Sequence, residues 1–187
     1  MNAVASPVDE RRATLTVGMV VTLAALAMTF GALLLAYGIV RVQAPAWPPP
    51  GEPPLPALWG WRWAATAAAI AGSAALWGAT RGSFVKAGAL AGAALAGAAF
   101  LALQVGCLRT LAAAGVRPSS GIVASVVYAL TAFHALHALI GLGVLAPSLF
   151  GALRGRGVDD GRLGALAAFW HLVTAVWLII FVAVFVA

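Results

Sequence analysis

Five long apolar runs, separated by short polar connectors, constrain this chain more than any other feature of its sequence. A membrane-crossing helix needs about 20 apolar residues, because the hydrocarbon core is about 30 Å thick. We therefore predict an all-α integral membrane protein with five transmembrane helices. The predicted spans cover residues 15–40, 63–80, 85–108, 121–150 and 163–187.

The composition excludes most soluble classes of protein. Hydrophobic residues make up 63% of the chain and charged residues only 9%, and the mean hydropathy is +1.01. Soluble domains carry about 25% charged residues, so disorder, a soluble enzyme and a nucleic-acid-binding module are all disfavoured. The net charge of +6 comes from Lys and Arg residues scattered between the apolar runs, and we expect no nucleic-acid partner.

Two segments are expected outside the membrane. Residues 1–13 form a short polar leader, and residues 14–187 form a single five-helix membrane domain. The first apolar run is too long for a signal peptide and lacks a cleavage pattern. Residues 41–62 form an external loop that contains seven of the ten prolines and is flanked by tryptophans, which favour the membrane surface.

The distribution of Lys and Arg predicts the topology. One side of the membrane would hold seven of them, Arg11, Arg12, Arg81, Lys86, Arg154, Arg156 and Arg162. The other side would hold four, Arg41, Arg62, Arg109 and Arg117. Because cytoplasmic loops carry the excess of positive charge, we predict a cytoplasmic N-terminus and a C-terminus on the opposite side.

Spans 63–80 and 85–108 are rich in alanine and glycine. Gly88 and Gly92 form a GxxxG step, which allows two helix backbones to approach closely in lipid. The alternative is that the alanines reflect only a compositional bias.

All three histidines lie inside predicted spans. The i, i+3 spacing places His134 and His137 on one helix face, and antiparallel packing of the last two spans would bring His171 to roughly 6 Å from His137 in depth. A metal or bis-histidine heme site is one interpretation, which would make the chain a small b-type cytochrome. Packing between helices is favoured, because no membrane carboxylate is available to orient an imidazole.

The predicted spans contain no acidic residue. All five acids lie outside them, namely Asp9, Glu10, Glu52, Asp159 and Asp160. Proton pumps and cation-coupled transporters usually need a membrane carboxylate, so the sequence argues against this chain moving protons by itself. Gln104 and Cys107 are the other polar interior pair.

Three stretches of sequence carry a resemblance to a known family. They are Gly18 to Arg41 with the following Trp47-Pro48-Pro49-Pro50-Gly51, then Phe100 to Gln104 with Phe133 to Gly141, and finally Phe169 to Trp177. In order and spacing they resemble subunit III of the heme-copper terminal oxidases, in its short five-span form. The second stretch is similar to the FHGLHVLIG signature of that family and the third to its YWHFVDVVW.

Three positions depart from the family pattern. Leu26 and Cys107 stand where the family carries Glu, and Thr174 stands where it carries Asp. No proton-gathering role is therefore carried over to this chain, and a structural role is favoured. A subunit III-like partner of nitric oxide reductase is an alternative that these departures leave open.

The resemblance implies an accessory, non-redox subunit that packs on the catalytic subunit of a respiratory oxidase and on other oxidase subunits. The complex would oxidise cytochrome c or quinol and reduce oxygen to water, with heme and copper in the partner subunit. In this chain we assign no catalytic, cofactor-binding or metal-binding residue, and we expect bound phospholipid and a bacterial-type inner membrane. The residues expected to make interhelical or lipid contacts are His134, His137, Trp170, His171, Trp177, Gln104 and, at a lipid headgroup, Arg41.

Overall fold

The computed structural model describes residues 7–53, 55–56, 58–82 and 85–186, with side chains from residue 13 onward. These residues form helices and their connections. The five long helices are α1 (Pro7–Gln43), α2 (Trp59–Thr80), α3 (Lys86–Ala113), α4 (Ile122–Leu153) and α5 (Asp160–Ile180). A 3-10 turn, η1 (Pro118–Ser120), precedes α4, and a π-helical turn, η2 (Phe181–Val186), extends α5.

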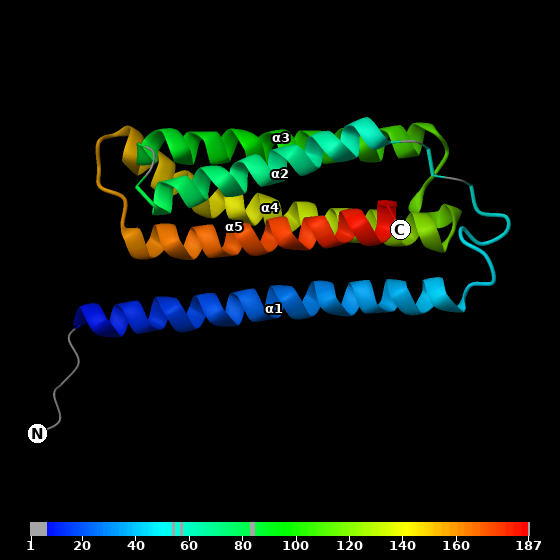
Figure 1. Ribbon diagram of the computed structural model, residues 1–187, viewed down its shortest axis with the longest axis horizontal. Coiled ribbons are helices and arrows are strands. Elements are labelled where there is room, and N and C mark those ends of the chain that lie inside the picture. The colour runs from blue at the N-terminus through cyan, green and yellow to red at the C-terminus, as the bar shows by residue number, and fades with distance from the viewer. Residues whose placement is uncertain (1–6, 54, 57, 83–84, 187) are drawn as a thin grey trace, which may run out of the picture.

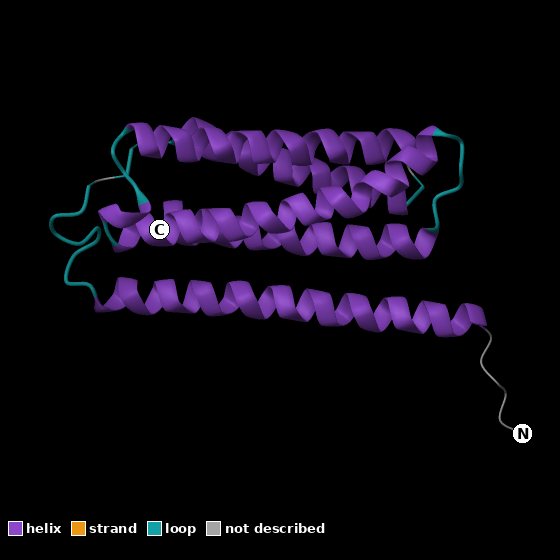
Figure 2. Cartoon of the chain, turned by 180° about the vertical axis from the view of Figure 1, so that it is seen from behind, coloured by secondary structure: helices purple, strands orange, loops and turns teal. Residues whose placement is uncertain are grey.

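The helices run side by side as an elongated bundle (Figure 1). Helices α2 and α3 form one layer, α4 and α5 lie against it, and α1 packs at the far edge on α5 and α4. Connections join neighbouring helices at alternate ends, as the view from behind also shows (Figure 2). As a result, α1 begins at one end of the bundle and α5 finishes at the other.

Helices α1 to α4 are longer than the predicted spans, and α5 reaches the length of its span only together with η2. Helix α1 begins at Pro7, inside the expected leader, at a position where proline suits the first turn of a helix. Helix α2 begins at Trp59, four residues before its predicted start, so Arg62 belongs to this helix and not to the external loop.

Within the described part of the chain, four helical stretches are long and apolar enough to cross a membrane, namely Ala13–Gln43, Lys86–Ala113, Ile122–Leu153 and Asp160–Val186. The expectation of a helical protein with membrane-spanning segments is therefore confirmed. Helix α2 does not reach the same hydropathy, because alanine, glycine, tryptophan and hydroxyl side chains replace most of the large aliphatic ones and Arg62 adds a charge.

Helix α1 contacts the bundle along one narrow stripe. The residues that pack inward recur every three or four positions, at Met19, Leu23, Leu26, Phe30, Leu33, Leu34 and Tyr37. This spacing is typical of helices that pack with a small crossing angle. The other faces of α1 remain exposed, with large side chains such as Val21, Met28 and Leu35 pointing outward.

Close packing of the other four helices centres on Trp170 of α5. Its indole ring lies in a recess made by one glycine from each neighbouring helix. A Cβ atom would lie 2.9 Å from the Trp170 Nε1 at Gly72 of α2, 2.6 Å from Cη2 at Gly97 of α3, and 3.2 Å from Cε3 at Gly141 of α4. Gly72 and Gly97 therefore leave no room for a Cβ atom beside the ring, whereas at Gly141 a Cβ atom would require the neighbouring rings to shift by a few tenths of an ångström.

The predicted GxxxG step has a smaller part in this packing. A Cβ atom at Gly92 would meet only the Ala75 Cβ, at an ordinary 3.8 Å, and one at Gly88 would meet nothing within 4 Å. The small residues of α2 and α3 do allow a close approach, but the tightest contacts occur at Gly72 and Gly97.

The proline-rich connection is fixed to the bundle by Glu52. Its carboxylate accepts hydrogen bonds from the backbone N–H groups of Ile122, at 2.7 Å, and Val123, at 3.0 Å. These are donors of the first turn of α4, which have no partner within that helix. Gly121 precedes them with φ of 152°, and a Cβ atom there would lie 2.2 Å from the Glu52 carboxyl carbon.

We expect Glu52→Ala to lower the free energy of unfolding by about 1 kcal/mol, the usual cost of losing a helix cap. Glu52→Gln keeps one acceptor oxygen and should have an intermediate effect. Thermal unfolding in mild detergent measures both variants. Equal midpoints for Glu52→Ala and the unaltered chain would contradict the capping role.

Candidate functional site

The centre of the bundle is a cluster of aromatic rings around His134. This side chain is only 1% exposed. Its ring centroid lies 5.9 Å from that of Phe30 on α1, 5.3 Å from Phe100 on α3 and 5.4 Å from Trp177 on α5. His134 itself comes from α4, so the cluster joins four of the five helices.

Trp177 extends the cluster to α2. Its indole Nε1 donates a hydrogen bond to the Thr66 hydroxyl oxygen at 3.0 Å, and both side chains are buried. The Thr66 hydroxyl in turn donates to the carbonyl oxygen of Arg62 in its own helix at 2.9 Å. This polar contact fixes the rotation of α5 against α2, because an apolar contact alone has no preferred direction.

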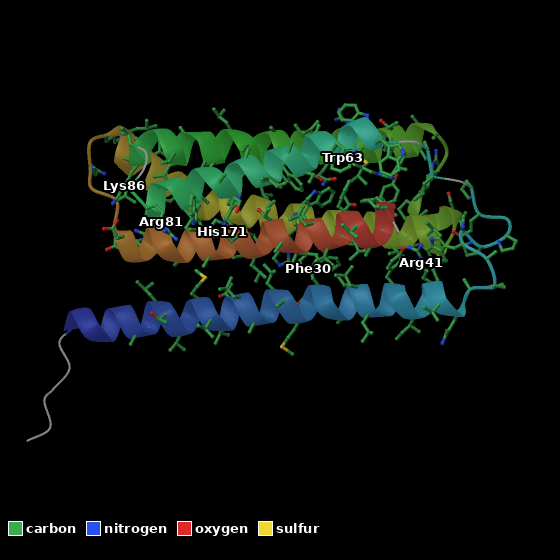
Figure 3. All side chains as sticks on the ribbon, in the orientation of Figure 1. Phe30, Arg41, Trp63, Arg81, Lys86 and His171 are labelled. Atoms are coloured by element: carbon green, nitrogen blue, oxygen red, sulfur yellow. The ribbon has the colours of Figure 1, made fainter. Side chains whose placement is uncertain are left out.

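His137 lies at the edge of the same cluster. Its ring packs edge-on against Phe30, with the centroids 5.3 Å apart, and its Nδ1 lies 2.7 Å from the Phe133 carbonyl oxygen of its own helix. Phe30 therefore lies between two histidine rings, and Figure 3 shows it reaching from α1 towards the rest of the bundle. Both of these contacts join α1 to α4.

A buried arginine lies towards the end of the bundle where α2 begins. Arg62 is 6% exposed, and its guanidinium carbon lies 3.9 Å from the Phe185 ring centroid. Its charge lies close to the side chain of Cys107 on α3. Its Nε and Nη2 atoms, like the Nε2 of Gln104, have no hydrogen-bond partner among the described residues.

The three positions where the family pattern carries an acid are all buried in this chain. Leu26 packs in the apolar cluster with Phe30. Cys107 lies beside Arg62, and Thr174 donates a long hydrogen bond, 3.4 Å, to the Ala69 carbonyl oxygen. Uncharged side chains therefore occupy positions where an acid would lie inside the bundle.

His171 lies apart from the central cluster. Its Nδ1 is hydrogen-bonded to the Ser73 hydroxyl of α2, and Figure 3 shows it nearer the end of the bundle that carries Arg81 and Lys86. It therefore faces α2, whereas His134 and His137 face α1 and the central rings. Among the residues that the structure describes, no three His, Cys, Asp or Glu side chains are grouped closely enough to hold a metal ion.

Arg41 joins the end of α1 to the end of α5. Its Nη1 donates to the Tyr37 hydroxyl oxygen at 2.8 Å and to the Ala183 carbonyl oxygen at 3.0 Å. The Tyr37 hydroxyl donates to the same carbonyl at 3.2 Å, and the Arg41 guanidinium lies 5.7 Å from the Trp47 ring centroid. Ala183 is among the last four residues of η2, whose carbonyl oxygens lack a partner within the helix and can accept from side chains.

The structure therefore brings only some of the predicted site residues together. His134, His137 and Trp177 belong to the central cluster, whereas Trp170, His171 and Arg41 make separate contacts with other helices. Gln104 is buried in α3. Sequence reasoning missed the parts played by Arg62, Thr66 and Ser73, although an arginine within a tryptophan-rich apolar run was a signal for the first.

A family model described as cytochrome c oxidase subunit III matches residues 72–187, from the middle of α2 to the end of the chain. A cytochrome c oxidase subunit 3 from Rhizopus stolonifer is 38% identical over 69 residues, which cover 36% of this chain and 25% of that protein.

Two further relatives match to the same extent. The cytochrome c oxidase subunit 3 of Prototheca wickerhamii is 38% identical and that of Sus scrofa 35% identical, each over 69 residues that cover 26% of the relative. The matched segment thus spans about a quarter of the length of these curated relatives. The family model, in contrast, covers more than half of this chain and includes α3, α4 and α5 completely. With four helices able to cross a membrane, the chain is an integral membrane protein, and it belongs to the cytochrome c oxidase subunit III family.

Proposed function

We propose that this chain is an accessory, non-redox subunit of a respiratory heme-copper oxidase, which packs on the catalytic subunit and stabilises it. The observation that supports the proposal is that the histidines inside the bundle contact side chains of neighbouring helices. His134 is enclosed by Phe30, Phe100 and Trp177, and His171 is bonded to Ser73, so both take part in contacts between helices. Family membership supports the assignment to an oxidase complex, in which the heme and copper belong to the partner subunit.

We propose that the chain forms a single membrane domain of five spans, in which α2 crosses the membrane in addition to the four more hydrophobic helices. Its 22 residues would reach about 33 Å, enough to cross the hydrocarbon core. Contacts with α3 and α5 cover part of its less apolar surface. The N-terminus would be cytoplasmic and the membrane a bacterial-type inner membrane.

The outward faces of the bundle would contact the catalytic subunit, other oxidase subunits and phospholipid. Large apolar side chains cover the exposed sides of α1 and α4. The side chains singled out from the sequence would then act as follows: His134, His137, Trp170, His171, Trp177 and Gln104 between helices, and Arg41 at the membrane surface.

The decisive experiment is to remove this chain from its purified complex. We expect every heme and copper absorption band to remain and the heme content per mole of catalytic subunit to stay unchanged, while sustained turnover falls. Loss of one heme equivalent with this chain, and loss of that heme in His171→Ala, would instead identify a cytochrome. An immediate stop of initial oxygen reduction would show that the chain carries part of the catalytic path.

The proposed topology is tested by thiol labelling of intact cells. In a Cys107→Ala background, a single cysteine in place of Gly155 is expected to resist an impermeant reagent, because the charge distribution places the loop between α4 and α5 in the cytoplasm. A single cysteine in place of Gly51 should react. Reversed labelling would overturn the orientation.

A further inference from the structure

A small cavity lies in the middle of the bundle, between α2, α3, α4 and α5. Its volume of about 20 Å³ is bounded by nine residues, among them Ala69, Gly97, His134 and Thr174. About 10–15 Å³ of such space is enough for one water molecule. The cavity is therefore large enough for a single water and too small for a cofactor.

Two polar side chains from different helices line this cavity. His134 is 1% exposed, and its Nδ1 has no hydrogen-bond partner among the described residues. A half-turn of the imidazole exchanges its nitrogens with ring carbons at almost the same volume, so the ring can present a nitrogen to the cavity. Thr174 is 7% exposed, and its hydroxyl makes only the 3.4 Å contact with the Ala69 carbonyl oxygen.

An unsatisfied polar atom in this position is costly. Leaving a buried donor or acceptor without a partner typically costs about 1–3 kcal/mol, and no water from the hydrocarbon region can supply one. Both His134 and Thr174 line this cavity, whose volume fits about one water molecule. The Thr174 hydroxyl donates its hydrogen to the Ala69 carbonyl oxygen, so its oxygen can still accept a hydrogen bond.

We propose that this cavity is a binding site for one ordered water molecule that links α4 to α5. The water donates one hydrogen to the Thr174 hydroxyl oxygen, whose own hydrogen stays on the Ala69 carbonyl oxygen of α2. It donates its second hydrogen to the unprotonated nitrogen of His134. Buried waters typically make two to four such bonds. The inference concerns this chain alone and does not depend on its proposed function.

A dry cavity is the competing state. Cavities that stay empty in proteins are lined by apolar groups and bind xenon. The aromatic and small side chains here resemble such a lining, but His134 and Thr174 do not. The two states differ in what occupies the cavity, and each has its own probe.

The test is a high-resolution structure of the full chain, purified in mild detergent with the proteins that remain bound to it. We expect one density peak within hydrogen-bonding distance of His134 and Thr174, and its loss in Thr174→Val, which removes the hydroxyl at nearly constant volume. Absence of a peak in the unaltered chain, or xenon entering the cavity under pressure, would overturn the proposal.

If the Thr174→Val chain folds too poorly for structure determination, its stability is measured instead. Loss of the water should reduce the ratio of folded to unfolded chain at least about fivefold, because an unpaired buried group remains. Thr29→Val is the matched control: Thr29 is exposed, and its hydroxyl bonds only the Ala25 carbonyl oxygen of its own helix. Equal stabilities of the two variants would also contradict the bound water.

Discussion

Replacing Gly97 with leucine is expected to prevent correct packing of the bundle. A Cβ atom at this position would lie 2.6 Å from the Trp170 Cη2 and 3.0 Å from the Leu142 Cδ2, so the side chain has no space at all. Trp170 cannot move away easily, because Gly72 and Gly141 enclose the same ring. Even Gly97→Ala should cost about 1–3 kcal/mol, the usual effect of overpacking.

The control for this prediction lies on the same helix. Gly92→Ala adds the same methyl group where the nearest atom is the Ala75 Cβ at 3.8 Å, and little change is expected. The yield of monodisperse chain in mild detergent, together with its thermal midpoint, distinguishes the variants. If Gly97→Ala and Gly92→Ala behave alike, the recess around Trp170 does not determine the packing of these helices.

Trp177→Ala is expected to destabilise the chain by about 3–5 kcal/mol, the range for deleting a buried aromatic side chain. The ring is 1% exposed and contacts both Phe100 and His134. The substitution also removes the hydrogen bond from Nε1 to Thr66. The loss therefore combines a cavity with the removal of the donor to the Thr66 hydroxyl oxygen, which keeps its own bond to the Arg62 carbonyl oxygen.

A double-mutant cycle separates the two contributions. Trp177→Phe keeps most of the ring but removes the donor, and Thr66→Val removes the acceptor. If the hydrogen bond stabilises the contact between α2 and α5, the two effects should be non-additive by at least about 0.5 kcal/mol, as measured by unfolding in detergent. Additive effects would show that Trp177 acts through packing alone.

Arg62 illustrates what sequence reasoning could not place. The sequence puts it among tryptophans at the start of an apolar run, where an arginine at the membrane surface is expected. In the structure it is buried beside Cys107 and Phe185, because α2 begins at Trp59 and turns this side chain towards α3 and η2. The contact with Cys107 joins residues 45 positions apart, and only the antiparallel packing of α2 on α3 brings them together.

The histidines also show what could not be predicted from the sequence. The sequence predicts correctly that His134 and His137 share one helix, since their i, i+3 spacing is local. It could not decide that His171 would face Ser73 on α2. The rotation of α5 about its own axis determines which neighbouring helix this side chain meets.

The sequence by itself determined the helical class, the approximate extent of the long helices and, through its motifs, the family. These properties depend on local composition and on spacing within one helix, which the order of residues contains directly. The tertiary structure alone decided that Trp170 fills a recess of three glycines, that Arg62 and Gln104 are buried, and that Glu52 caps α4. A helix that is apolar on nearly every side carries little signal for its inward face, so its rotation is set by contacts with helices distant in the sequence.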